Sequence, residues 1–128
     1  MALEQIQLSE VILGPFEGLP PSPNQTKGAH WSKLHSTKQE WQQLVGYASL
    51  AHRRAIGSPW AKAQVHYTIN VGDNRRHDPD NLLASVCKPT LDGMTGIIIA
   101  DDSIDNIELS FTFTRDKPRG FTIRVTKV

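Results

Sequence analysis

Three segments in which apolar and polar residues alternate constrain the fold more than any other feature of the sequence. They are the segments 63–72, 106–114 and 120–128. A period of two places successive side chains on opposite faces of a β-strand, so each segment predicts a strand with one buried face. The loop 116–120, which contains Pro118 and Gly120, predicts that the last two strands form a hairpin.

Two further segments have the spacing of helices. Residues 37–56 are expected to form a helix with Ser36 as its N-cap. Its apolar stripe is formed by Trp41, Leu44, Val45, Ala48 and Ala51. A second, shorter helix is expected to begin at Asn81 with Asp80 as its N-cap, and Pro89 is expected to end or kink it.

An opening strand is expected at 5–13, where Gly14-Pro15 ends it. The elements then follow the order strand, helix, strand, helix, strand, hairpin. This order predicts a single α+β domain over residues 1–128, with a mixed sheet of about four or five strands and helices packed on it.

Several classes of protein are disfavoured by the composition. A single cysteine, Cys87, excludes an internal disulfide and a cysteine-based zinc cluster, and its apolar neighbours favour a small buried residue over a nucleophile. No basic-then-apolar leader and no apolar run of about 18 residues is present, so we expect a cytoplasmic protein that does not bind a membrane.

The loop expected at 14–35 is rich in glycine and proline and is long for a compact domain, which favours a functional role. Its candidate DNA-binding residues are Lys27, His30, Trp31 and Lys33. An aromatic side chain among cations can stack on a base or sugar while the cations contact phosphate. A Trp31 that fills the core under the loop explains the residue equally well.

Acidic residues gather in one window of the sequence, between positions 73 and 108. Eight of the thirteen acids and only three of the fourteen cations lie there, which leaves −5 inside the window and +6 in the rest of the chain. Arg75 and Arg76 at the start of this window are further candidates for contact with DNA. An acidic spot in a basic surround is the charge distribution expected of a protein that holds a divalent metal against a phosphate backbone.

The first candidate metal ligands are Asp78 and Asp80. Pro79 keeps Asp78 extended, and residues two apart in an extended segment point to the same side, so both carboxylates can face one point. A structural turn and helix cap explains this segment, which continues with Asn81, without any metal.

The second group of acids is Asp101 and Asp102, which follow the apolar run 97–99. We expect that run to be a buried strand, which would hold carboxylates rigidly, and only one of the two needs to enter the site. Mg²⁺ typically takes one or two carboxylates, waters and phosphate oxygens, and Lys88 could stabilise charge on the phosphate. These residues alone therefore indicate a Mg²⁺ site that acts on phosphate.

At this point the chain resembles the RusA-type Holliday junction resolvases of bacteria and their phages. The matching segments, in the order of that family, are 20–24 (Pro-Pro-Ser-Pro-Asn), His30-Trp31 with Trp41, 75–81 (Arg-Arg-His-Asp-Pro-Asp-Asn), 88–93 (Lys-Pro-Thr-Leu-Asp-Gly) and Asp101-Asp102. Together they span roughly residues 20–105.

The resemblance implies a small α+β homodimer that binds four-way DNA junctions and nicks two opposing strands with Mg²⁺, for which Mn²⁺ could substitute. It assigns the metal to Asp78, Asp80 and Asp102, with Asp101 and Asn81 in secondary roles, and the catalytic lysine to Lys88. A two-fold dimer would supply the two sites that symmetric nicking needs.

The chain departs from the family pattern at one position. The catalytic lysine of the best-known members lies four residues after the second acid of the motif, where this chain has Ala84, and Lys88 lies four residues further on. This departure motivates an alternative, a DNA-junction-binding structural protein with a degenerate active site. A Ca²⁺-stabilised binding module is a third possibility, which the basic surround disfavours.

Overall fold

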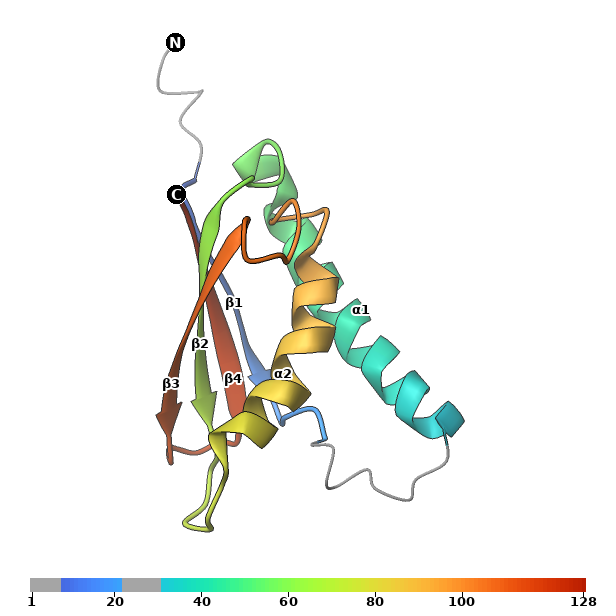
Figure 1. The fold of residues 1–128 in the computed structure, drawn as a ribbon, viewed down its shortest axis with the longest axis vertical. Coiled ribbons are helices and arrows are strands. Elements are labelled where there is room, and N and C mark those ends of the chain that lie inside the picture. The colour runs from blue at the N-terminus through green and yellow to red at the C-terminus, as the bar shows by residue number, and fades with distance from the viewer. Residues whose placement is uncertain (1–7, 22–30) are drawn as a thin grey trace.

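The computed structural model describes residues 8–21 and 31–128, and the side chains of all of these except 31–36. In chain order the elements are β1 (Glu10–Glu17), α1 (Trp31–Ile56), β2 (Ala63–Asn70), α2 (Pro79–Met94), β3 (Ile107–Thr114) and β4 (Gly120–Lys127). The four strands form one sheet in the order β1-β4-β2-β3, and both helices lie on the same side of it (Figure 1). The expected α+β fold with a mixed sheet is therefore confirmed.

The alternating segments form the centre of the sheet. The strand β2 pairs in parallel with β3 and antiparallel with β4, so that Tyr67 lies between Phe111 and Ile123. Tyr67 is buried under the helices, whereas His66 lies on the open face between the Ser110 and Thr112 hydroxyls at 2.6 and 3.0 Å. In β2, period-two alternation thus separates a core face from a polar face, as predicted, whereas in the edge strand β3 Leu109 and Phe113 of the expected buried face are each 40% exposed.

The prediction for the first strand was wrong in its bounds. The expected segment lies partly outside the described residues, and the observed β1 continues past Gly14-Pro15 to Glu17. A shift of register between Leu13 and Phe16 accommodates the proline. Because β1 is an edge strand, a residue without an N–H donor is tolerated there.

The helix α1 begins at Trp31, six residues before the expected start at 37. No proline or glycine lies between Trp31 and the expected N-cap Ser36, so nothing in the sequence prevents the helix from extending back. Its buried stripe also differs from the prediction. Val45 is fully buried, whereas Leu44 is 47% exposed and Ala51 is also exposed, because the spacing fits two neighbouring ridges of the helix equally well.

The helix α2 begins earlier than predicted. Pro79 occupies its first turn, where a missing N–H costs nothing, and Asp78 is therefore the N-cap residue in place of Asp80.

The helix also continues through Pro89 to Met94, so the expectation that it ends there was wrong. Tertiary contacts outweigh the local penalty. The Thr90 hydroxyl shares a 2.6 Å hydrogen bond with that of Tyr67 on β2, and Gly93 lies so close to α1 that a Cβ atom would stand 2.6 Å from the Gln42 carbonyl oxygen.

The apolar run 97–99 is not the buried strand that we expected. Ile98 and Ile99 are fully buried in the core, but they lie in a turn after α2, and Ile99 pairs with Trp60 and Thr95 through isolated bridges only. Gly96, with a φ of 83°, follows the end of the helix. The acids Asp101 and Asp102 therefore follow a buried turn rather than a strand.

Candidate functional site

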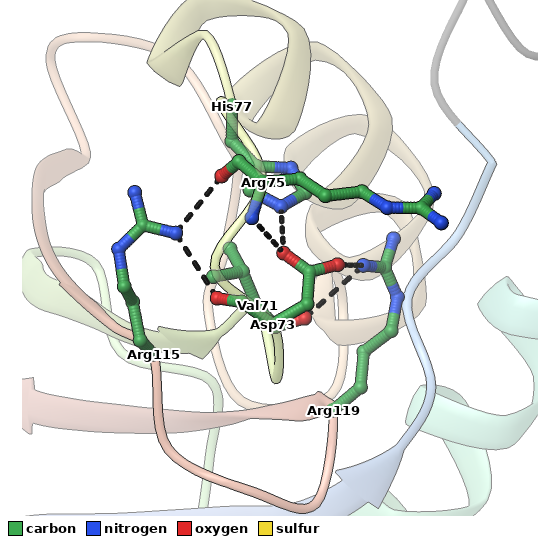
Figure 2. A network of polar contacts seen from close by, with 6 residues as sticks. All are labelled: Val71, Asp73, Arg75, His77, Arg115 and Arg119. Carbon is green, nitrogen blue, oxygen red and sulfur yellow. Dashed lines mark hydrogen bonds and ion pairs between the residues drawn. The ribbon is translucent and has the colours of Figure 1, made fainter.

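The loop between β2 and α2 carries most of the predicted site residues, and a network around Asp73 shapes it (Figure 2). Asp73 Oδ1 accepts hydrogen bonds from the Arg75 main-chain N–H at 3.0 Å and from His77 Nε2 at 2.6 Å. The bond from His77 is the largest of the effects that hold the pKa of Asp73 below its ordinary value. Asp73 is therefore an anion, and the hydrogen bonds that it accepts fix the conformation of the loop.

Two arginines from the loop between β3 and β4 donate hydrogen bonds to main-chain carbonyls of the same segment. Arg115 Nη1 donates to the carbonyl oxygens of Asp73 and Arg75 at 3.0 and 2.9 Å (Figure 2). Arg119 Nη1 donates to the Val71 carbonyl at 3.2 Å and lies 4.0 Å from Asp73 Oδ2. Segments forty or more residues apart are thus joined at the end of the sheet.

Next to this network lies a hollow of about 550 Å³, which we call the arginine hollow. It is lined by Pro20, Asp73, Arg75, Arg76, His77, Asp78, Asn81, Leu82, Ser85 and Arg119. The structure therefore brings four of the predicted site residues together: Arg75, Arg76, Asp78 and Asn81. The predicted ligands Asp80 and Asp102 are not among its lining residues.

Asp78 is extended, as predicted, with φ −90° and ψ 123°. Its carboxylate lies 3.5 Å from Arg76 Nε and makes no capping hydrogen bond to α2. Asp80, by contrast, belongs to the first turn of the helix. Asp78 and Asp80 therefore do not form the extended pair that we predicted, because the chain becomes helical between them.

A second polar group lies further along α2 and consists of Lys88, Asp92 and Asp102; we call it the lysine group. Lys88 Nζ lies 3.1 Å from Asp92 Oδ1 and 4.0 Å from Asp102 Oδ2. The hydrogen bond to Asp92 is the largest of the effects that raise the pKa of Lys88, so this side chain stays a cation at neutral pH. Asp101 is exposed and its carboxylate accepts the N–H of Asp102 at 2.9 Å.

The predicted ligand Asp80 and the lysine group stand apart along the helix. Asp80 and Lys88 are separated by about 12 Å of helical rise, since each residue adds about 1.5 Å. Within the part of the chain that the structure describes, no group of three or more His, Cys, Asp or Glu side chains lies close enough to hold a metal ion. The donors present are carboxylate oxygens, which match the preference of Mg²⁺.

Of the residues expected to contact DNA from the first loop, Lys27 and His30 lie outside the described residues. Trp31 and Lys33 belong to the first turns of α1 and not to a loop, which corrects the prediction for this segment.

Sequence reasoning missed Asp73, Arg115 and Arg119 as parts of the site. The signal available was weak. Asp73 is the first acid of the acidic window, and the two arginines flank the hairpin loop, but only the pairing of strands brings them together.

Cys87 is a structural residue rather than a nucleophile in this arrangement. It is only partly exposed, and burial raises the pKa of its thiol to about 11, which keeps it neutral and unreactive. This agrees with the interpretation of its sequence context.

Comparison with protein-family models and with curated proteins gives no match for the chain. Among the helices of the described residues, none is long and apolar enough to cross a membrane.

Proposed function

We propose that the chain is a Mg²⁺-dependent endodeoxyribonuclease that resolves four-way DNA junctions and related branched DNA by paired nicks. The observation that carries the proposal is the lysine group, in which Lys88 Nζ lies 4.0 Å from Asp102 Oδ2. Two motifs of the resemblance, 14 residues apart, thus meet at a cation and a carboxylate of the types that phosphodiester hydrolysis needs.

The candidate metal ligands are Asp78, Asp80 and Asp102, and in this proposal one or two of them hold the ion at a time, since the three do not form one group in the structure. Their oxygens suit Mg²⁺ or Mn²⁺, and a Mg²⁺ ion is typically held by one or two carboxylates together with waters and substrate phosphate, so a closed cage of protein ligands is not required. When bound, the metal would lower the pKa of a water molecule and neutralise charge on the scissile phosphate.

In this proposal Lys88 acts as a fixed positive charge. Its raised pKa keeps it protonated, and Asp92 restrains the ammonium from the next turn of the same helix. A compact cation near the phosphate stabilises negative charge that develops in the transition state or on the leaving oxygen.

The proposed partner is branched DNA, and the proposed assembly is a homodimer. Arg75 and Arg76 are both exposed and lie beside Asp78, so phosphates that they hold would pass the proposed metal ligands. A two-fold dimer places two copies of the site on one junction, as paired nicks demand.

Cleavage of a labelled synthetic four-way junction tests the proposal, with a linear duplex of the same sequence as the control. We expect paired symmetric nicks in the junction with Mg²⁺, none with EDTA and none in the duplex. Equal cutting of both substrates would show that the activity is not specific for junctions. Cleavage in EDTA would show that the activity does not require a metal ion.

A second candidate is a junction-binding structural protein that does not cleave. The distance of about 12 Å along α2 between Asp80 and Lys88, together with Ala84 at the usual lysine position, favours it. Junction binding without nicks under all metal conditions would support this candidate. Cleavage by the natural chain that is lost in Asp80→Asn would eliminate it.

A further inference from the structure

We propose that the arginine hollow is a seat for one backbone phosphate of the bound DNA, with Arg119 and Arg75 as its contacts and Arg115 as a positioning residue. The inference rests on the proposed function for the identity of the ligand. It adds a site that lies apart from the lysine group and depends on two arginines that the sequence motifs do not contain: Arg119 lines the hollow, and Arg115 holds the loop next to it.

The hollow collects cations from two distant segments. Arg75 and Arg76 come from the loop before α2, and Arg119 comes from the loop between β3 and β4. A guanidinium presents donors in a planar fork that matches two phosphate oxygens, which makes arginine well suited to this ligand. The hollow has a volume of about 550 Å³, which leaves room for a phosphate together with its sugar.

Donors on these arginines remain available to a ligand. Arg119 uses Nη1 for the Val71 carbonyl, and within the described residues its other N–H groups make no hydrogen bond. The guanidinium of Arg75 makes no hydrogen bond or ion pair in the same part of the chain, and it extends away from the Asp73 carboxylate (Figure 2).

The acids of the hollow do not cancel its attraction for an anion. Three arginines and two aspartates line it, which leaves a formal charge of +1, and Asp73 Oδ1 already accepts hydrogen bonds from the Arg75 N–H and from His77. Asp73 Oδ2 lies 4.0 Å from Arg119 Nη1, which is beyond hydrogen-bond distance. A phosphate oxygen can therefore bind this guanidinium at a shorter distance. Asp78 is already paired with Arg76 at 3.5 Å.

The main chain around the seat is held before any ligand arrives. Arg115 fixes two successive carbonyls of the loop, and Gly72 packs so closely that an added Cβ would stand 3.0 Å from the Cβ of Arg119. Donors that are positioned in advance need not be ordered on binding, which favours affinity.

The test compares Arg119→Gln with Arg124→Gln in the binding of a fluorescent four-way junction in EDTA, across a series of salt concentrations. Both changes remove one positive charge, but Arg124 lies on β4 away from the hollow and pairs with Glu10. We expect Arg119→Gln to lower affinity about tenfold and to reduce the salt slope by about 0.9, the value for one lost phosphate contact. Arg124→Gln should stay within about twofold of the natural chain.

Equal effects of the two changes would overturn the seat, as would an absence of DNA binding by the natural chain. If Arg119→Gln lowers the thermal unfolding midpoint, Arg119→Lys decides. It keeps the charge and loses the fork, and we expect an intermediate affinity with an unchanged salt slope, whereas natural affinity would overturn the role of the fork.

The measurements separate this inference from the proposed function. Binding in EDTA does not depend on cleavage. If Arg119→Gln lowers junction affinity but the natural chain makes no nicks in Mg²⁺, the phosphate seat is supported and the proposed nuclease activity is refuted. If the natural chain cleaves the junction but Arg119→Gln and Arg124→Gln bind it equally well, the nuclease activity is supported and the phosphate seat is refuted. Competition by inorganic phosphate at constant ionic strength distinguishes a site for free phosphate, and displacement of the junction at millimolar phosphate would overturn the assignment to DNA.

Discussion

The arginine hollow at the N-terminal end of α2 and the lysine group further along the same helix are built in different ways. Around the hollow, side chains of the loop between β3 and β4 hold the segment after β2 through hydrogen bonds to main-chain carbonyls, and Arg115 and Arg119 supply three of these bonds. In the lysine group, Lys88 and Asp92 are neighbours on one helical ridge, and only Asp102 comes from another segment. The first depends on long-range pairing and the second mainly on helical spacing.

This difference separates two tasks that the proposed function requires. The hollow is rich in guanidinium groups and suits binding of a phosphate backbone. The lysine group pairs two carboxylates with one cation and suits the chemical step. Changes at the arginines of the hollow and changes in the lysine group should therefore affect different measurements, whereas Asp78 lines the hollow and is also a proposed metal ligand.

The largest effect is expected from Asp102→Asn. The change removes a proposed metal ligand, so single-turnover cleavage of the junction should fall about 100-fold or more, while binding in EDTA stays the same or strengthens because a negative charge is lost. Asp105→Asn, an exposed acid of the same loop, is the matched control and should cleave at the natural rate. Equal rates for both variants would remove Asp102 from the site.

The next effect is on stability, and Gly72→Ala should show it. Gly72 has a φ of 73°, and an added Cβ would crowd the main chain of Arg119 at 3.1 Å, so we expect a loss of about 2 kcal/mol in urea unfolding. Gly96→Ala, with a φ of 83° and open space around it, carries the backbone strain alone and should lose about 1 kcal/mol. Equal losses would show that contact with Arg119 does not matter.

Lys88→Ala should slow cleavage about tenfold and change junction affinity by less than about twofold, because its charge acts on the transition state. The measurement is the single-turnover rate at saturating protein. Lys62→Ala removes another exposed lysine, which lies outside both groups, and is the control. A natural rate for Lys88→Ala would end its catalytic role.

The smallest effect concerns pH and belongs to the hollow. The pKa of Asp73 is held below its ordinary value of 3.8, so its interactions contribute stability above about pH 4 that is lost as the pH falls through the lower folded-state value. The melting temperature of Asp73→Asn should therefore lie below that of the natural chain at pH 7 and approach it at pH 3. Asp116→Asn is the control, and a gap for Asp73→Asn that is the same at both pH values would contradict the prediction.

Much of the fold could be predicted because it depends on local patterns. The strands β2, β3 and β4 lie within one or two residues of the alternating segments, and α1 ends at Ile56 as expected. The errors fell where local signals compete with packing. Ser36 carries a capping signal inside a longer helix, and Pro89 carries a breaking signal inside a helix that burial holds together.

In the candidate site, too, contacts between residues close in the sequence could be predicted, whereas those that depend on the rest of the fold could not. Lys88 and Asp92 could be paired from their spacing, because residues four apart share a helical face. Asp80 was misjudged because a single proline at Pro79 fits both an extended segment and the first turn of a helix, and only the start of α2 distinguishes them.

The sequence by itself determined the alternating strands, the acidic window between positions 73 and 108, and the order of the motifs, because each follows from residues close together in the chain. Only the tertiary structure decided that Arg115 and Arg119 close over the loop of Asp73 and that Asp102 approaches Lys88. Such contacts depend on which strands pair and in which register. That choice is made by burial of the whole core face, and no short segment of the sequence carries it.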